Sequence, residues 1–372
     1  MDSIREQIIK DLNTLCSKRL VLAVSGGLDS ICLAHYFITN KVLLGLEWLG
    51  IAHVNHGLRE VSADLDEALV RKFAAKYDIP FFCVQLDGHA LKASEKSLEE
   101  AARDERYKAL CDIAKSESKS QSTDEAKEPL AIVTAHHALD QAETVYMRLR
   151  RGTSLEGLKG MQRIVEKSYG NNSIKIFRPF LDISRAVLLE YAKKNQLTWR
   201  EDESNSDVKF LRNKIRHVLL PNLEKQVRGA SLQLSRIASL ADNAYLKIIC
   251  ITDKLFTPAI TTNPDGIEEI LQSSKKTIAL DSKKLRNIFN SIHKESAKNE
   301  QPFSSPELFR LWLSSNGFRF PIGFFNNKKN EATLKLPVNT AYRKRSIFKF
   351  KQTIIICEFK DNVTAQKFVS CK

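Results

Sequence analysis

The 372-residue chain carries 58 Lys and Arg against 44 Asp and Glu, which gives a net charge of +14 at pH 7. Its hydrophobic content of 43% and charged content of 27% are typical of a folded protein and exclude a disordered class. No apolar run approaches the ~20 residues of a membrane helix, so we expect no membrane partner. The length predicts two or three domains.

The positive excess is common among proteins that bind nucleic acid, because Lys and Arg neutralise phosphates. A lysine-rich solvated surface gives the same balance, so charge alone leaves both interpretations open. The seven cysteines include no Cys-x-x-Cys pair, which favours a reducing cytoplasm and argues against a zinc site. The N-terminus, MDSIREQIIKDL, has no apolar stretch, so we predict no secretory signal and a cytoplasmic location.

Strand-like runs alternate with helical patterns over the first half of the chain. The runs cover residues 20–24, 48–54, 80–86, 130–135 and 174–180. Helical patterns lie between most of them, at residues 62–77, 97–114 and 140–150. This alternation predicts an α/β, Rossmann-like fold with a parallel sheet that helices cover on both faces. Ligands of such sheets bind at the carboxyl ends of the strands.

A glycine loop follows the first run, and an amphipathic helical pattern starts directly after it. The loop is Ser25-Gly26-Gly27-Leu28-Asp29-Ser30. Strand, glycine turn and helix form a geometry that holds phosphate, because glycines let backbone N–H groups approach an anion and the helix adds its positive end. An ordinary glycine turn is the alternative, and the full six-residue pattern disfavours it. The loop is not a Walker A motif, since no Gly-Lys-Ser/Thr closes it.

A second polar cluster begins where the fourth run ends, at His136, and continues into a helix. Asp140 and Glu143 are three residues apart, so they share one helical face in or near the first turn. Paired acids at the carboxyl end of a strand can hold Mg²⁺, bind an ammonium group or act as a general base. Simple capping of the helix is the alternative interpretation.

The remaining segments change character. Residues 115–129 are polar without an apolar period and predict a flexible surface insertion. Residues 231–256 show helical spacing, and residues 257–275 form a looser stretch rich in Asn and Ser. Residues 301–372 hold 13 Lys and Arg against 4 Asp and Glu, with strand-like runs at 346–350 and 353–359. We interpret this last part as a small basic module.

Several blocks of the sequence carry a family resemblance. They are SGGLDS, HVNHGLR (53–59), EAARDERY (100–107), AHHALDQAET (135–144), RRGTSLEGLKGM (150–161), RPFL (178–181), DESN (202–205) and RNKIR (212–216). In this order they resemble the motifs of the tRNA(Ile)-lysidine synthetase family of PP-loop ATP pyrophosphatases, over about residues 15–225. Leu139 departs from the pattern, because family members usually have an acid there, and we expect this side chain to turn inward to the helix-packing face.

The resemblance implies ATP-dependent ligation of free L-lysine to C2 of the wobble cytidine in the CAU-anticodon tRNA(Ile). ATP would adenylate the base and release pyrophosphate, and the lysine amine would then displace AMP. The implied cofactors are ATP and Mg²⁺, and a homodimer stays open. Two alternatives compete: another PP-loop enzyme such as a tRNA thiolase, which the missing Cys-x-x-Cys pair disfavours, and a non-catalytic tRNA-binding paralogue.

The resemblance also assigns roles to residues and ranges. We expect catalytic residues at Asp29, Asp140, Glu143 and Arg212, and substrate contacts from Arg103, His136, Asp140 and Arg216. ATP would bind Ser25, Gly26, Gly27, Leu28, Asp29, Ser30 and His53, with Asp29 as the Mg²⁺ ligand. The domains would be residues 1–224 (catalytic PP-loop domain), 225–300 (helical, tRNA-binding) and 301–372 (basic module with a role in tRNA binding).

Overall fold

In the computed structural model, the described residues are 2–57, 60–94, 97–120, 130–169, 172–201, 211–260, 274–281, 284–285, 287–288, 291, 305–316, 340–342, 345–350 and 353–359. The chain divides into two compact units. The first comprises Met1–Thr153 and Gly157–Ser239, and the second comprises Ser154–Glu156 and Leu240–Lys372. Within the described residues, no helix combines the length and the apolar character needed to span a bilayer.

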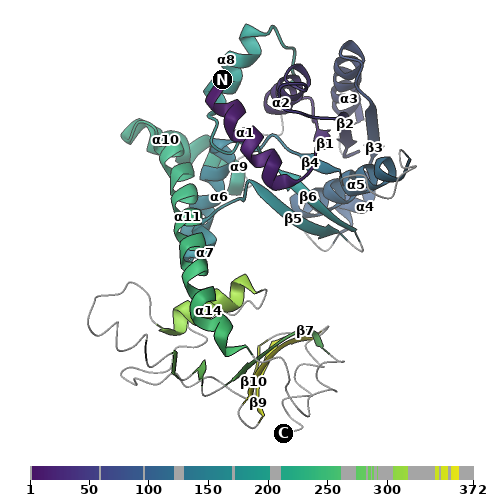
Figure 1. Ribbon diagram of the computed structural model, residues 1–372. Coiled ribbons are helices and arrows are strands. Elements are labelled where there is room, and N and C mark those ends of the chain that lie inside the picture. Colours follow the sequence, from purple (N-terminus) through teal and green to yellow (C-terminus); the bar gives the residue numbers. More distant parts are fainter. Residues whose placement is uncertain are drawn as a thin grey trace. The chain divides into compact units, whose positions relative to one another are not determined.

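The first unit is built on a six-stranded sheet in the order β3-β2-β1-β4-β6-β5 (Figure 1). All neighbouring pairs are parallel except β5 with β6, so the predicted α/β fold with a mainly parallel sheet is confirmed. The strands are β1 (Arg19–Ala23), β2 (Trp48–Asn55), β3 (Phe81–Gln85), β4 (Ala131–Val133), β5 (Ile164–Tyr169) and β6 (Asn172–Phe177).

Strand β5 was not predicted, because its sequence IVEKSY lacks a clear apolar run. Residues 166–168 are exposed, as expected for an antiparallel strand at the edge of a sheet. Pairing with β6, and not a local sequence pattern, therefore sets the conformation of β5.

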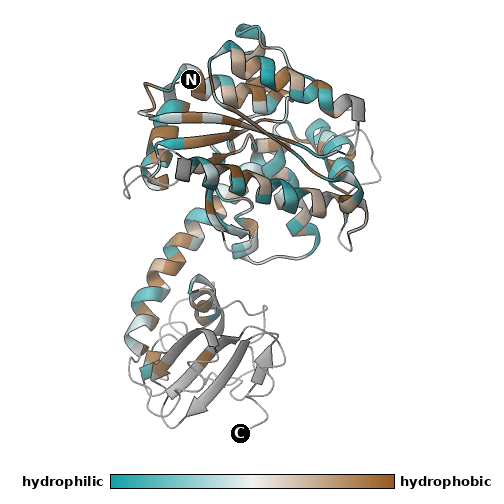
Figure 2. Ribbon diagram, turned by 90° about the vertical axis from the view of Figure 1, so that its right-hand side faces the viewer, coloured by the Kyte–Doolittle hydropathy of each residue, from teal (hydrophilic) through white to brown (hydrophobic). Residues whose placement is uncertain are grey.

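Helices cover both faces of this sheet, as predicted. Leu20 and Leu22 of β1 face one apolar core, whereas Val21 between them faces the other. The first core is completed by α1 (Asp2–Leu15), α2 (Leu28–Thr39), α3 (Glu60–Lys76) and α8 (Arg185–Lys194), and the second by α5 (Leu98–Ser120). Figure 2 shows the hydrophobic strands enclosed between helices whose outer faces are hydrophilic. This packing holds the carboxyl ends of the parallel strands β3, β2, β1, β4 and β6 along one edge.

The helices that follow complete the first unit and lead into the second. They are α4 (Gly88–Lys92), α6 (Ala138–Arg150), α7 (Leu155–Leu158), α9 (Leu211–Lys214), the π-helical η2 (Ile215–Leu219), α10 (Leu220–Gln226), α11 (Ala230–Phe256) and the 3₁₀ turn η3 (Thr257–Ala259). The helix predicted at residues 231–256 is confirmed by α11. The expectation of an irregular insertion from residue 115 is wrong at its start, because α5 continues to Ser120. Residues 121–129 lie outside the described residues.

The second unit contains an antiparallel sheet in the order β7-β10-β9-β8. Its elements are β7 (Ser274–Asp281), α14 (Ser305–Ser315), β8 (Thr340–Tyr342), β9 (Arg345–Phe350) and β10 (Thr353–Phe359). The two strands predicted near the C-terminus are confirmed by β9 and β10. The division into residues 1–224, 225–300 and 301–372 stays a prediction, although β7 from the second range pairs with β10 from the third.

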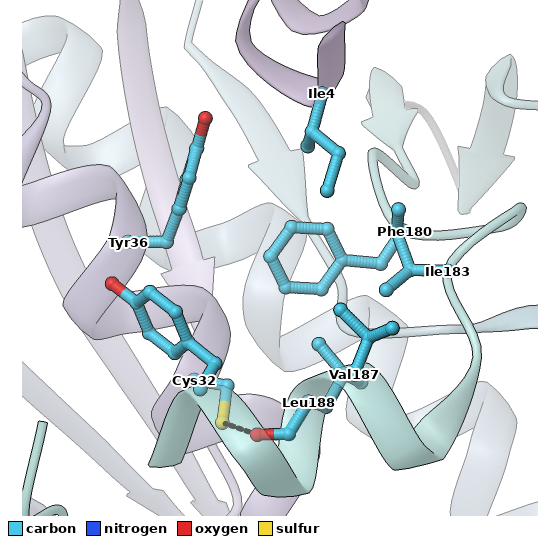
Figure 3. A pocket seen from close by; sticks show the side chains of 8 residues that line it. Ile4, Cys32, Tyr36, Phe180, Ile183, Val187 and Leu188 are labelled. Atoms are coloured by element: carbon cyan, nitrogen blue, oxygen red, sulfur yellow. Dashed lines mark hydrogen bonds between the residues drawn. The ribbon is translucent and has the colours of Figure 1, made fainter. Parts of the chain in front are cut away.

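A small apolar cavity marks the contact of α8 with α2 (Figure 3). Its volume is about 10 Å³, which is room for about one water molecule. The Cys32 thiol donates a hydrogen bond to the Leu188 carbonyl oxygen over 3.3 Å. Burial, with a smaller effect from the charge of Asp29, raises the pKa of Cys32 to about 12, so this thiol is neutral. Cys32 therefore serves here in packing.

We expect Leu188→Ala to lower the free energy of unfolding by about 2–5 kcal/mol, because the lost side chain would enlarge this cavity. Leu188 is 4% exposed. Urea unfolding of the full chain measures the effect. Leu65→Ala is a matched control in the same unit, since Leu65 is 48% exposed and its truncation removes little buried surface. Equal effects of the two substitutions would contradict the packing role of Leu188.

Candidate functional site

The glycine loop connects β1 to α2 at the carboxyl edge of the sheet. Gly26 adopts φ +93°, a backbone conformation that favours glycine, and Gly27 is the N-cap of α2. The Ser30 hydroxyl donates to the Gly27 carbonyl oxygen over 2.9 Å and accepts the Ser25 N–H over 3.2 Å. The Ser25 and Ser30 hydroxyls are also 3.2 Å apart. Ser30 thus fixes the loop, and the first turn of α2, with Leu28 and Asp29, presents N–H groups to an anion.

Arg200, which sequence reasoning missed, braces this loop, and His53, which it assigned to the nucleotide, contacts the residue before the loop. The Arg200 N–H donates to the Gly26 carbonyl oxygen over 3.1 Å, and Arg200 Nε donates to Asp66 Oδ1 over 2.6 Å. His53 is 4% exposed, and its Nδ1 lies 2.8 Å from the Val24 carbonyl oxygen. Arg200 lies two residues before the DESN block, which was the one available signal in the sequence. Residues 202–205 themselves are outside the described residues.

Asp29 lies in the first turn of α2 and points toward the second polar cluster. Its Oδ2 lies 3.5 Å from His137 Nε2. Its Oδ1 is buried and, within the described part of the chain, has no hydrogen-bond partner. A buried carboxylate oxygen without a partner is unfavourable unless a cation or donor joins it. This oxygen therefore fits the Mg²⁺ ligand that the sequence predicts at Asp29.

His137 joins the loop to α6. The backbone N–H of His137 donates to Asp140 Oδ2 over 3.0 Å, and His137 Nδ1 accepts the Leu139 N–H over 3.2 Å. Nε2 is then the protonated nitrogen, and it lies 3.6 Å from Asp140 Oδ2 as well as near Asp29. Burial lowers the pKa of His137, but the hydrogen bond to Asp29 and the charge of Asp140 outweigh it, so the net pKa is raised. In the sequence analysis this histidine appears only within the AHHALDQAET block, without a role.

Asp140, Glu143, Arg212 and Arg216 form one cluster, which we call the carboxylate–arginine cluster. Arg212 Nε donates to Glu143 Oε2 over 2.7 Å, and Arg216 Nη2 donates to Asp140 Oδ1 over 2.7 Å. Arg216 Nε also donates to Glu143 Oε1, and Arg212 Nη2 lies 3.4 Å from Asp140 Oδ1. The Glu143 side chain is 0% exposed. The fold thus brings together four residues that the sequence separates by about 70 positions.

The charges in this cluster balance, with two carboxylates against two guanidinium groups. Burial alone would raise the pKa of Asp140, but His137, His136 and both arginines outweigh it and lower the pKa to about 2. Asp140 is therefore ionised at neutral pH. Such a cluster can exchange one cation for another, because an ammonium group can replace a guanidinium group against the same carboxylate oxygens.

Leu139, the residue that departs from the family pattern, packs against a small apolar cluster. Ala142 of α6, Ile215 and Leu220 form the centre of that cluster. The expectation that Leu139 turns to the helix-packing face is confirmed. Its contacts help to seat the helix that carries the two arginines.

His136 and Arg103 occupy different surroundings. His136 Nδ1 lies 2.9 Å from Thr134 Oγ1. Burial, aided by nearby arginines and opposed by Asp140, lowers the pKa of His136 to about 3, so its ring is neutral. Arg103 of α5 lies over the Tyr107 ring, with its Cζ 5.7 Å from the ring centroid. The substrate contacts expected of these two residues stay predictions.

The low pKa of Asp140 has an acid-side consequence. The pKa is about 2 in the folded protein and about 3.9 in an unfolded chain, so its contribution to stability is present above about pH 4 and is lost as the pH falls toward 2. We expect Asp140→Asn to flatten the fall in the free energy of unfolding between about pH 5 and pH 2. Urea titrations at several pH values measure this slope. An equally steep fall in the variant would contradict the ion pairs described above.

The fold and the loop define an α/β protein of the nucleotide-binding kind. The chain belongs to the PP-loop domain family, whose model matches residues 1–223. This membership supports the use of ATP and agrees with the resemblance found in the sequence motifs.

Curated relatives each match more than half of the chain. A tRNA(Ile)-lysidine synthase of Geobacter sulfurreducens is 37% identical over 251 residues, which are 67% of this chain and 49% of that protein. One of Clostridium acetobutylicum is 36% identical over 62% of this chain and 47% of that protein. The chain thus spans about half the length of these relatives. Among solved structures, a U34-tRNA thiolase of Methanococcus maripaludis superposes with a TM-score of 0.48 at 18% identity, over 65% of this chain and 79% of that one.

Proposed function

We propose that this protein ligates free L-lysine to C2 of the wobble cytidine in the CAU-anticodon tRNA(Ile) and consumes ATP. The observation that carries the proposal is the carboxylate–arginine cluster, which His137 links to Asp29 beside the phosphate-binding type of loop. The names of the relatives, tRNA(Ile)-lysidine synthase, support it.

In the first step, the O2 atom of the cytosine attacks the α-phosphorus of ATP and pyrophosphate leaves. Negative charge grows on the pyrophosphate, and the N–H groups of the loop and of the first turn of α2 would stabilise it. The Ser25 hydroxyl would add a donor, whereas Ser30 already holds the loop. Mg²⁺, held by Asp29, would neutralise phosphate charge. The assignments of Asp29 and His53 to the nucleotide belong to this proposal.

In the second step, the side-chain amine of lysine attacks C2 and AMP leaves. The amine has a pKa of ~10.4, so it arrives as an ammonium group and must lose a proton. Asp140 and Glu143 would bind the ammonium in place of a guanidinium group of Arg212 or Arg216. With a pKa of about 2, Asp140 is a weak base while the arginines surround it. Loss of one guanidinium contact raises that pKa and makes Asp140 a better proton acceptor.

The displaced arginine then gains a role. A guanidinium group that leaves Asp140 or Glu143 is free to contact a phosphate of the adenylated base or of tRNA. The exchange keeps both the ammonium and the arginine paired. The tRNA-binding roles of residues 225–300 and 301–372 belong to this proposal. Arg343 and Lys344 of the basic module lie outside the described residues.

The experiment measures pyrophosphate release from ATP by the full chain, with tRNA(Ile) transcript and each amino acid in turn. We expect release that requires the transcript with cytidine at the wobble position, and a tRNA product only with lysine. A transcript with uridine at that position is the matched control. If sulfur donors support pyrophosphate release and lysine does not, the result favours a thiolase. If the protein binds tRNA but shows no turnover, the result favours a non-catalytic paralogue. Either result overturns the proposal.

A further inference from the structure

A proline lies inside the helix that carries both arginines of the carboxylate–arginine cluster. α9, η2 and α10 follow one another without a break, and Pro221 is the second residue of α10. A proline in a helix interior lacks the N–H donor, and its ring clashes with the carbonyl group four residues earlier. Here that carbonyl belongs to His217, within the π-helical turn Ile215–Leu219. The wider turn ends just before the proline, where an α-helix would be most strained.

The π turn changes which residues share a face. The Leu220 N–H bonds the Ile215 carbonyl oxygen, five residues back, instead of the oxygen four residues back. In an α-helix, residues five apart point about 140° away from each other, whereas the wider π turn brings them onto one face. Ile215 is 0% exposed and Leu220 is 1% exposed, and both belong to the apolar cluster at Ala142 of α6. Both anchors therefore depend on the extra residue in the turn.

The anchors set the position of the arginines. Arg216 follows Ile215 directly, and Arg212 precedes it by three residues, so both guanidinium groups reach Glu143 from a helix that Ile215 holds against α6. With an α-helical turn in place of the π turn, Leu220 and Ile215 could not both stay docked. If Leu220 stayed in the apolar cluster, Arg216, four residues earlier, would turn toward that cluster and away from Glu143. If Ile215 stayed there instead, Leu220 would point away from the cluster.

We propose that Pro221 is a positioning residue, which enforces the π turn and so sets the register at which Arg212 and Arg216 meet Asp140 and Glu143. Pro221 touches no reacting atom in this scheme; it acts through the two arginines. The inference deepens the proposed function and rests on it for its kinetic readout. The claim that Pro221 sets the register of the two arginines rests on the contacts of the described residues and does not depend on the proposed function.

The first test is Pro221→Ala, which permits an α-helical turn and favours helix. We expect the KM for lysine to rise at least about tenfold, equivalent to about 1.4 kcal/mol of lost binding, while the KM for ATP stays within about twofold. Pro258→Ala is the matched control, because Pro258 is an exposed proline near the start of the short η3 turn. Lysine kinetics unchanged in Pro221→Ala overturn the inference.

A rescue variant separates register from general damage. Deleting Val218, which is 39% exposed, from the Pro221→Ala chain removes the extra residue of the π turn. Ile215 and Leu220 then stand four positions apart and share a face in a plain α-helix. We expect this variant to recover most of the lysine affinity lost in Pro221→Ala. A deletion variant no better than Pro221→Ala overturns the inference, because a merely structural proline would make the deletion additional damage.

A measurement without turnover tests the geometry itself. Arg216→Lys should lower the midpoint of urea unfolding in the wild-type background, and by less than half as much in the Pro221→Ala background, where Arg216 no longer meets Glu143. Equal shifts in both backgrounds overturn the inference. If the wild-type protein shows no lysine-dependent turnover, the proposed function fails, and this double-mutant cycle alone decides the role of Pro221.

Discussion

Asp29→Ala is expected to lower ATP-dependent pyrophosphate release by about 10²–10³-fold or more, because it removes the carboxylate proposed to hold the Mg²⁺ that neutralises phosphate charge. The Asp29 carboxylate has one oxygen near His137 and one buried oxygen without a described partner. The affinity for tRNA should stay nearly unchanged, since Asp29 belongs to the loop. Steady-state turnover and filter binding of labelled tRNA measure the two effects separately.

Two further variants test whether the effect of Asp29→Ala is specific to the glycine loop. Ser30→Ala should also abolish most turnover, by a different route, because Ser30 holds Gly27 and Ser25 in the loop through hydrogen bonds. Asp112→Ala is the control, an exposed aspartate on α5 that should leave turnover within about twofold. Near-normal turnover in Asp29→Ala would show that the loop does not bind the reacting phosphates.

Glu143→Gln is expected to stop lysine transfer and to destabilise the first unit by about 3–5 kcal/mol. The side chain is fully buried and pairs with both Arg212 and Arg216, so the neutral amide leaves two guanidinium groups short of one negative charge. The ammonium group of lysine also loses a partner. If Glu143 acts only in the second step, adenylated tRNA should accumulate, which acid-quenched reactions with α-labelled ATP would detect.

The control for this variant is Glu105→Gln. Glu105 forms an exposed ion pair with Lys108 on α5, and such pairs contribute about 0–1 kcal/mol. We expect normal lysine kinetics and an unfolding midpoint close to that of the wild-type protein. Unchanged kinetics and stability in Glu143→Gln would contradict the proposed roles of Asp140 and Glu143, and would leave them only as acids near the start of α6.

Much of the first unit followed from local pattern. The runs around residues 20–24 and 48–54 became β1 and β2 because a strand buried on both faces needs a continuous apolar sequence. The glycine loop between strand and helix was also predicted from its residues, and Gly26 in it adopts a backbone conformation that favours glycine. The spacing of Asp140 and Glu143 on one helical face was equally local. The family resemblance named Arg212 and Arg216 as site residues but did not name their partners.

The tertiary structure decided what those side chains meet. No sequence pattern showed that Arg212 and Arg216 both close on Glu143, that His137 bridges Asp29 and Asp140, or that Arg200 braces Gly26. These contacts join segments far apart in the chain, and their geometry depends on how the helices pack on the sheet. Strand β5 was missed for the same reason, since an edge strand takes its conformation from its partner.

The sequence by itself thus determined the α/β class, the loop and the identity of the charged residues, because periodicity, glycine and acid spacing act over a few neighbouring positions. Only the tertiary structure decided the charge balance of the carboxylate–arginine cluster and the register at which Arg212 of α9 and Arg216 of η2 meet the two acids. A proline predicts a break in an α-helix, but the choice of a π turn over a kink depends on Ile215 and Leu220 docking together on α6. That choice is made by packing, which no local pattern encodes.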